Sequence, residues 1–269
     1  MKKQLKIIIL IAWCCACLGF HGATQQTQTN PMNKQFVFVP GSFHGAWCWY
    51  KMQPLLSQHG NHSTAIDLPA HGLDNTPISQ VTLDSYVDAV CKVLETCEKP
   101  VVLIGHSRGG IVISQVAERM PEKIDKLVYL CAFLIPNGEP MVATALQDTA
   151  SKLVSGLIFN ETEGWHYPKK EIFEAAFYND CSPADVFLCS NLLTKEPNVP
   201  VGTPLQLSED RYGKVKKVYI HTTLDQAVTL GIQKRMVDRL PVDQTIELKA
   251  GHSPFLSKPE ELANLLLNL

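Results

Sequence analysis

Short apolar runs alternate with segments of helical periodicity along most of the chain after about residue 34. A run of mostly apolar, often β-branched residues indicates a strand that is buried on both faces. Apolar residues spaced three and four apart, as in 83–96 and 111–120, indicate helices that pack on a sheet. The runs that we interpret as strands are 35–39, 64–68, 101–105, 127–133, 215–221 and 245–248. This alternation predicts an α/β fold with a mostly parallel sheet and helices on both of its faces.

The regular alternation breaks between about residues 136 and 213. An insertion into a regular α/β chain often covers the functional site, and the apolar content of this one favours a packed cap over a mobile loop. Structural decoration is the alternative. Within the insertion, Ser182 followed by Pro183 predicts the start of a helix, because serine caps helices and proline is accepted in the first turn. The last helix is expected to begin with Ser257 as its cap and Glu260 returning the bond.

The first thirty residues have the pattern of a targeting segment. Three lysines precede the apolar run 7–20, and the polar stretch 24–30 follows it. An apolar run of 14 residues is short for a bilayer span of about 20 residues. We therefore predict a secretory signal peptide over 1–23 and an exported mature domain over 24–269, in the periplasm or outside the cell. A retained signal anchor and a lipid-modified cysteine at position 14, 15 or 17 are the alternatives.

Charge and composition exclude two classes of protein. Lysine and arginine number 24 against 26 acidic residues, so the net charge is −2, and it falls to about −5 once the three lysines of the signal peptide are removed. This balance gives no electrostatic reason to expect nucleic acid or an anionic membrane as a partner. No run after residue 20 is long and apolar enough to span a bilayer, which argues against a polytopic membrane protein. With 45% hydrophobic residues the chain can bury a sizeable core.

Cysteines give a second set of expectations for an exported protein. Nine cysteines become six when the signal peptide is removed, and six cysteines allow fifteen full pairings, among which the sequence does not choose. Cys181 and Cys189 are close enough in sequence to form a pair. Cys131 lies in an apolar run and is interpreted as a small buried hydrophobic residue. The six are Cys48, Cys91, Cys97, Cys131, Cys181 and Cys189.

Residues 105–109, Gly-His-Ser-Arg-Gly, fit the pattern G-x-S-x-G between the apolar run 101–105 and the helical run 111–120. A sharp turn from strand to helix needs small residues on each side of its central serine, because the backbone there is tight and strained. Such a turn lifts the hydroxyl clear of the sheet, and the N–H groups of the following helix point toward a developing oxyanion. We therefore interpret Ser107 as a nucleophile rather than a structural turn residue.

A serine nucleophile needs a base, and the base needs an orienting acid. In folds with this elbow, the acid follows a late strand and the histidine precedes the last helix. Asp225 lies just beyond the run 215–221, and His252 lies between the run 245–248 and the last helix. The sequence therefore predicts Ser107, Asp225 and His252 as a catalytic triad. The weaker competitors are the acids Glu209, Asp210, Asp238 and Asp243 and the histidines at 44, 59, 62, 71, 106 and 221.

The loop after the first strand, 40–47, is expected to complete the oxyanion hole. Gly41 permits a tight turn, and we expect the backbone N–H groups of Ser42 and Arg108 to be the two donors. A glycine turn that packs two tryptophans into the core is an alternative that is compatible with this role. The candidates for lining the pocket are Phe43, His44 and His106.

These residues resemble the α/β-hydrolase fold family, and more narrowly its plant methylesterase and hydroxynitrile lyase branch with the bacterial esterase relatives. The elbow is shared by the whole superfamily, whereas His-Gly-Ala-Trp at 44–47 is the narrower signal. The resemblance is firm over about 35–133 and 211–269 and loose in the cap. It implies Ser107, Asp225 and His252 as the triad and the same two backbone donors.

Two departures from that branch bear on the reaction. Many relatives have a histidine where this chain has Pro40. Hydroxynitrile lyases of the branch carry a threonine in the first loop and a lysine after the catalytic histidine, where this chain has Gly41 and Ser253. Because a cyanohydrin lyase needs a cationic group for the leaving cyanide, ester hydrolysis is the better interpretation.

The sequence thus predicts a serine carboxylesterase that hydrolyses small or medium uncharged esters through an acyl-enzyme. Its partner is a small-molecule ester, and neither a metal nor an organic cofactor is expected. A lyase on the same scaffold and a non-catalytic ligand receptor are the alternatives. The physiological substrate and the oligomeric state stay open.

Overall fold

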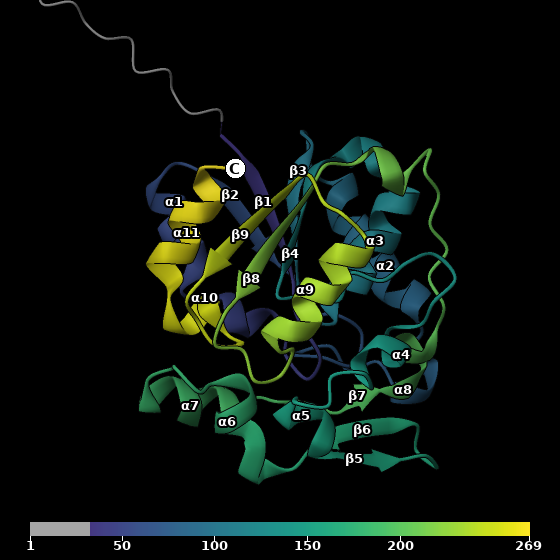
Figure 1. Ribbon diagram of the computed structural model, residues 1–269. Helices are drawn as coiled ribbons and strands as arrows, with labels where there is room; N and C mark the ends of the chain where they lie inside the picture. Colours follow the sequence, from purple (N-terminus) through teal and green to yellow (C-terminus); the bar gives the residue numbers. More distant parts are fainter. Residues whose placement is uncertain (1–32) are drawn as a thin grey trace, which may run out of the picture. The chain divides into compact units, whose positions relative to one another are not determined.

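The computed structural model describes residues 33–269, and the predicted signal peptide over 1–23 lies outside this range. Six parallel strands form the central sheet in the order β2-β1-β3-β4-β8-β9 (Figure 1). The predicted fold class, a mostly parallel sheet with helices, is thereby confirmed. The strands are β1 (Gln35–Val39), β2 (His62–Ala65), β3 (Val101–His106), β4 (Ile124–Leu130), β8 (Lys217–Thr222) and β9 (Gln244–Leu248).

Helices cover both faces of this sheet, because parallel strands need crossover connections that run over a face (Figure 1). Alternate residues of β1 point to opposite sides, so Phe36 and Phe38 enter one buried layer and Val37 and Val39 enter the other. The first layer includes residues of α1, α10 and α11, and the second includes residues of α2, α3 and α9. These helices are α1 (Met52–Gln58), α2 (Leu83–Glu95), α3 (Gly109–Arg119), α9 (Leu230–Arg239), α10 (Pro254–Ser257) and α11 (Pro259–Leu267).

β2 and β4 differ most from their predicted positions, and β8 begins at Lys217 instead of residue 215. β2 ends at Ala65, although the predicted strand continues to Leu68. Ile66 and Leu68 are buried, but they lie in the loop that follows the strand. β4 begins at Ile124 and ends at Leu130, and the buried residues after it leave the sheet where Cys131 adopts a φ of +38°. Burial alone therefore overestimates both strands at their carboxyl ends.

The segment 136–213, which we call the cap, carries a second, smaller sheet and several short helices below the central sheet in Figure 1. β6 pairs antiparallel with both β5 and β7. The predicted helix start at Ser182 is confirmed, since its hydroxyl accepts from the Asp185 N–H at 3.2 Å and Pro183 is the first helical residue. The cap elements are α4 (Met141–Ala145), α5 (Lys152–Ser155), β5 (Leu157–Asn160), β6 (Trp165–Pro168), α6 (Phe173–Phe177), α7 (Pro183–Ser190), β7 (Glu196–Pro197) and α8 (Asn198–Gly202).

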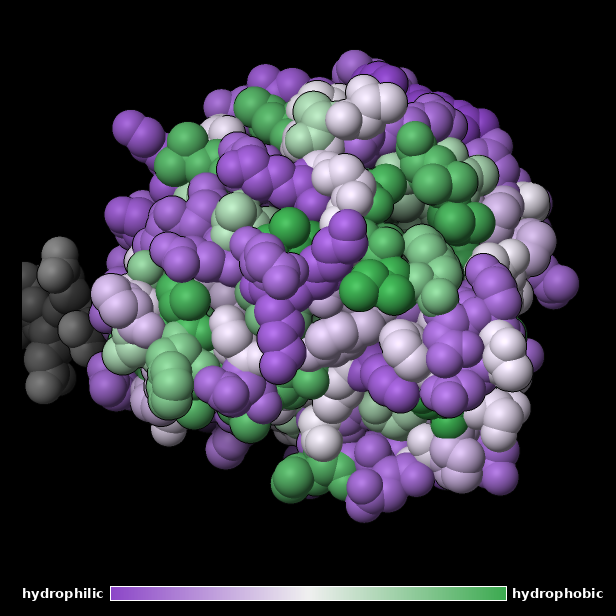
Figure 2. Space-filling view, turned by 90° about the horizontal axis from the view of Figure 1, so that it is seen from below, coloured by the Kyte–Doolittle hydropathy of each residue, from purple (hydrophilic) through white to green (hydrophobic). Residues whose placement is uncertain are grey.

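The cap also carries most of the large apolar side chains that reach the surface. Figure 2 shows this end of the molecule, where green apolar groups lie among purple polar residues. Phe173 and Phe177 of α6 are instead buried against the central domain. The apolar residues of the cap thus divide between its inner and outer sides. The exposed ones are Leu146, Ile158, Phe159, Phe187, Leu188, Leu192 and Val199.

The predicted cap of the last helix is wrong. α11 begins at Pro259 after Lys258, and no side chain caps it. Ser257 is the final residue of α10, and its hydroxyl donates to the Ser253 carbonyl at 3.4 Å. The serine therefore belongs to the preceding turn.

All six cysteines within residues 33–269 are free thiols, so the Cys181–Cys189 pair is not formed. Cys131 is fully buried, as the apolar run around it predicts. Burial raises the pKa of the Cys189 thiol to about 12.

None of the helices within residues 33–269 is long and apolar enough to cross a bilayer.

Candidate active site

Ser107 stands at the turn between β3 and α3, with a φ of +52° that a non-glycine residue rarely adopts. The turn is tied to the end of β4, because the Ser107 N–H donates to the Leu130 carbonyl at 3.2 Å and the Ser107 carbonyl accepts from the Phe133 N–H at 2.9 Å. A Cβ at Gly110 would meet the Phe133 backbone, so glycine is needed there for close packing. This is the strained elbow that the sequence motif predicts.

Asp225 and His252 meet beside the elbow. The Nδ1 atom of His252 lies 2.8 Å from Oδ2 of Asp225, and both side chains are almost fully buried. Because a carboxylate accepts, Nδ1 carries the proton and Nε2 keeps its lone pair. Asp225 lies three residues beyond β8, and His252 lies between β9 and α10. The structure thus brings together the acid and the base that sequence order selects, at the end of the sheet where Ser107 stands.

The carboxylate of Asp225 is held by its own loop. Its Oδ1 accepts from the backbone N–H groups of Ala227 at 2.8 Å and Val228 at 2.9 Å. Its Oδ2 accepts from the Thr222 hydroxyl at 2.9 Å as well as from His252. The acid is therefore fixed in the orientation that directs Oδ2 at the imidazole.

Ser42 lies in the loop against the elbow. A Cβ placed at Gly41 would lie 2.8 Å from Cβ of Ser107, so the two segments approach as closely as backbone allows. Among residues 33–269, neither the Ser42 N–H nor the Arg108 N–H donates a hydrogen bond to the protein. Free N–H groups beside a nucleophile are what an oxyanion hole requires.

His44 supports the Ser42 loop from behind. Its Nδ1 lies 2.8 Å from the Ser42 carbonyl, and its Nε2 lies 2.9 Å from the hydroxyl of Tyr178, a cap residue. Burial lowers the pKa of His44 to about 3, which keeps the imidazole neutral. The neutral ring donates to Ser42 and accepts from Tyr178. His44 is fully buried, and its ring nitrogens face these two residues.

Acid is expected to destabilise the fold through His44. Its folded pKa of about 3 lies below the unfolded value of about 6.5. The neutral form therefore stabilises the fold above pH 6.5, and this contribution is lost as the pH falls toward 3, by up to about 1.4 kcal/mol per pH unit. Denaturant unfolding at pH 7, 6, 5 and 4 measures the slope.

The matched variant is His44→Asn, whose amide can still donate to the Ser42 carbonyl but does not titrate. We expect the free energy of unfolding of this variant to fall less steeply than that of the wild type as the pH is lowered. The difference between the two slopes is expected to be up to about 1.4 kcal/mol per pH unit. If the free energy of unfolding of the two proteins falls with the same slope as the pH is lowered, His44 is not the group responsible.

The other two pocket-lining candidates are buried as well. His106 donates from Nε2 to the His252 carbonyl at 2.8 Å, and burial holds its pKa well below the usual range. Phe43 adopts a φ of +67°, and its ring packs against Phe177 of the cap with ring centres 5.9 Å apart. Both therefore shape the surroundings of the triad, His106 from behind His252 and Phe43 beside Ser42.

Sequence reasoning missed the polar cap residues that hold this site. Asp180 accepts a hydrogen bond at 2.7 Å from the N–H of Gly251, the residue before His252. The Asn179 amide donates at 3.0 Å to the carbonyl of Leu224, the residue before Asp225. Glu196 of β7 is fully buried next to Arg108. The only signal in the sequence is polarity, which is equally typical of surface loops.

His106, Cys131 and His252 form the one group within residues 33–269 whose donor atoms could hold a metal ion, all lying within 4.8 Å of one another. His252 is bonded to Asp225 through Nδ1, and burial raises the pKa of the Cys131 thiol far above its usual value. These contacts fit a proton-transfer site better than a metal site.

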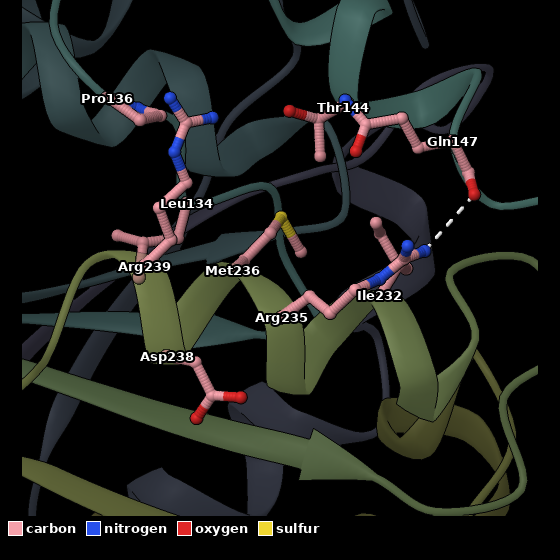
Figure 3. Close-up of a pocket in the computed structure, with 9 residues that line it drawn as sticks. All are labelled: Leu134, Pro136, Thr144, Gln147, Ile232, Arg235, Met236, Asp238 and Arg239. Atoms are coloured by element: carbon pink, nitrogen blue, oxygen red, sulfur yellow. Dashed lines mark hydrogen bonds between the residues drawn. The ribbon is translucent and has the colours of Figure 1, made fainter.

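A pocket of about 430 Å³ lies elsewhere, between α9 and α4 (Figure 3). Its apolar lining includes Ile232 and Met236, and two arginines flank it. The Arg235 guanidinium donates to the Gln147 carbonyl at 3.1 Å, and Arg239 pairs with Glu139. No triad residue lines this pocket, and both guanidinium groups already have protein partners.

The chain matches the family model described as the alpha/beta hydrolase family over residues 36–265. Methylesterase 10 of Arabidopsis thaliana is 34% identical over 265 residues, which cover 90% of this chain and 94% of that protein. The protein named "Putative methylesterase 11, chloroplastic", of the same species, is 35% identical over 246 residues, which cover 87% of this chain. The match spans 63% of that relative's length, less than two thirds.

Among solved structures, polyneuridine aldehyde esterase aligns with a TM-score of 0.81 at 28% identity. The alignment covers 88% of this chain and 98% of that chain. The fold and the resemblance to the methylesterase branch are therefore both confirmed.

Proposed function

The chain belongs to the alpha/beta hydrolase family, and we propose that it is a serine carboxylesterase acting on small or medium uncharged esters. The observation that carries the proposal is the buried pair of Asp225 and His252, 2.8 Å apart, beside an elbow serine in a strained conformation. Relatives named as esterases support ester hydrolysis in general.

In the proposed reaction, His252 takes the Ser107 proton through Nε2 while the hydroxyl attacks the ester carbonyl. Asp225 stabilises the imidazolium that forms. The N–H groups of Ser42 and Arg108 bind the tetrahedral oxyanion, a contribution of about 3 kcal/mol per donor. His252 then protonates the leaving alcohol, and the same base activates the water that releases the acid.

The surroundings of the triad favour an uncharged substrate. Phe177 of the cap packs over His252 with ring centres 5.9 Å apart, and Phe43 packs against Phe177. The Arg108 guanidinium and the Glu196 carboxylate are paired with each other, and the Asp225 carboxylate is bonded to His252. An ester with a charged acyl group would therefore lose solvation without gaining a partner.

Methyl esters are the first class to test, because several relatives are named methylesterases. The experiment measures hydrolysis of p-nitrophenyl acetate and butyrate together with a panel of neutral methyl esters. We expect turnover of short-chain esters and loss of turnover for matched esters with a carboxylate on the acyl group. Equal rates for neutral and charged esters would contradict the substrate class.

The lyase alternative is tested with the same preparation. Ser253 follows His252 where a lyase of this branch has lysine, and the Ser253 side chain is fully buried. The proposal predicts ester hydrolysis without cyanide release from a neutral cyanohydrin. Cyanide release without ester hydrolysis would replace the esterase assignment by a lyase.

A further inference from the structure

The side chain of Arg108 is buried directly behind the proposed oxyanion hole. Its Nη2 donates to the Gly41 carbonyl at 3.0 Å, and the side chain is 0% exposed. The Gly41 carbonyl and the Ser42 N–H belong to one planar peptide unit, in which they point in opposite directions. A bond that fixes the carbonyl therefore also fixes the direction of the N–H. Because the donor is charged, the bond also polarises the peptide and makes the N–H a stronger donor.

Glu196 of the cap holds the other side of the same loop. Its Oε2 accepts from the Phe43 N–H at 3.1 Å, and its Oε1 lies 3.1 Å from Nε of Arg108. Two further groups reach the carboxylate, the His71 imidazole at 2.9 Å and the Tyr86 hydroxyl at 3.3 Å. Segments that are far apart in the sequence thus converge on one buried carboxylate.

The charges in this cluster compensate one another. Burial by itself raises the pKa of the Glu196 carboxyl, but Arg108 and His71 beside it hold that pKa well below its usual range. The Arg108 guanidinium also lies 4.6 Å from the centre of the Tyr86 ring, a distance typical of a cation–π contact. Removing Arg108 alone would leave the Glu196 carboxylate buried without its guanidinium partner.

Resting on the proposed function, we infer that the Arg108 side chain, paired with Glu196 of the cap, is a positioning group that directs and polarises the Ser42 N–H of the oxyanion hole. Arg108 then contributes to both donors of the oxyanion hole. Its backbone N–H is one donor, and its side chain fixes the Gly41–Ser42 peptide that carries the other. Glu196 makes the arrangement depend on the cap, because the carboxylate that balances Arg108 comes from β7.

The test compares Arg108→Met, Arg108→Lys and the charge-neutral double variant Arg108→Met with Glu196→Gln. The double variant removes the guanidinium and the carboxylate together, and the amide oxygen of its glutamine can still accept from His71, which keeps the test usable if Arg108→Met fails to fold. For p-nitrophenyl butyrate we expect kcat to fall about 100-fold in Arg108→Met and in the double variant, with little change in KM. Arg108→Lys is expected to recover part of this loss. The control is Arg239→Met, which removes an exposed guanidinium and is expected to keep the wild-type kcat.

A transition-state analogue separates positioning from general damage. A trifluoromethyl ketone forms a tetrahedral oxyanion adduct with the nucleophile, so its Ki should rise by the factor by which kcat/KM falls. A purely structural role predicts a lower stability with unchanged kcat and Ki in the folded fraction. That result in the double variant would overturn the inference and leave the esterase assignment intact.

A further readout does not depend on turnover. In protein labelled with [¹⁵N]serine, the Ser42 amide signal is identified by its loss in Ser42→Ala. We expect its nitrogen resonance to move upfield in the double variant, because the Gly41 carbonyl loses its hydrogen bond, and to stay unchanged in Arg239→Met. An unchanged Ser42 signal in the double variant would overturn the inference even if the wild-type protein hydrolyses no ester.

Discussion

Replacing Ser107 by alanine is expected to lower kcat for p-nitrophenyl butyrate by about 10⁵-fold or more, as losses of a triad serine do in other enzymes. The hydroxyl is the only group on the elbow that can form an acyl-enzyme, and alanine leaves the oxyanion donors in place. The residual rate reports those donors together with substrate binding. Steady-state kinetics with active-site titration measures the loss.

The matched control is Ser114→Ala. Ser114 is also fully buried and lies on α3, where its hydroxyl contacts the Gly110 carbonyl and the Tyr129 hydroxyl, both at 2.8 Å. We expect this variant to lose stability of about 1 kcal/mol and to retain kcat. Comparable losses of kcat in the two variants would show that the effect of Ser107→Ala is structural.

The second large effect is expected for Asp225→Asn, with kcat lowered about 10⁴-fold, the size of the analogous change in chymotrypsin-type proteases. Because Oδ1 of Asp225 accepts from the Ala227 and Val228 N–H groups, the asparagine oxygen must take that position. Its amide nitrogen then faces Nδ1 of His252 as a donor. The imidazole must place its proton on Nε2, where it can no longer accept from Ser107.

Asp243→Asn is the control for this change. Asp243 was a competitor for the acid in the sequence, and its Oδ2 accepts from the Lys217 N–H at 2.8 Å. We expect kcat to stay within about twofold of wild type, since surface changes away from a site are nearly neutral. A large loss in Asp243→Asn with none in Asp225→Asn would reverse the assignment of the acid.

The places of the three residues proposed as a triad could be predicted because chain order and strand position determine them. Ser107, Asp225 and His252 each follow a strand of one parallel sheet, and the carboxyl ends of parallel strands lie together. A local motif identifies the serine, and position along the chain identifies the other two. The parallel sheet could be predicted for the same reason, since its strands are nearly continuous apolar runs.

The supporting contacts could not be predicted, because they join segments that no local pattern relates. Glu196 lies 88 residues from Arg108 in sequence and sits in a short polar stretch that resembles a surface loop. The role of His44 depends on Tyr178, which lies 134 residues away. The ends of β2 and β4 and the helix cap at Ser257 were predicted wrongly for local reasons. Buried residues continue beyond the last paired residue of each strand, and only Lys258 separates α10 from α11.

The signal peptide over 1–23 and the export of the chain stay predictions, since those residues lie outside the described range. N-terminal sequencing of protein recovered from outside the cytoplasm would test both. A mature N-terminus near residue 24 is expected.

Covalent labelling shows whether Ser107 is an activated nucleophile. The wild-type protein is treated with a fluorophosphonate probe at neutral pH, and the modified peptide is identified by mass spectrometry. We expect one adduct per chain on Ser107, loss of labelling in Ser107→Ala, and slow labelling in Asp225→Asn. A folded wild-type protein that takes up no probe, or takes it up on another residue, would contradict the role of Ser107 as nucleophile and favour a non-catalytic receptor or a different nucleophile.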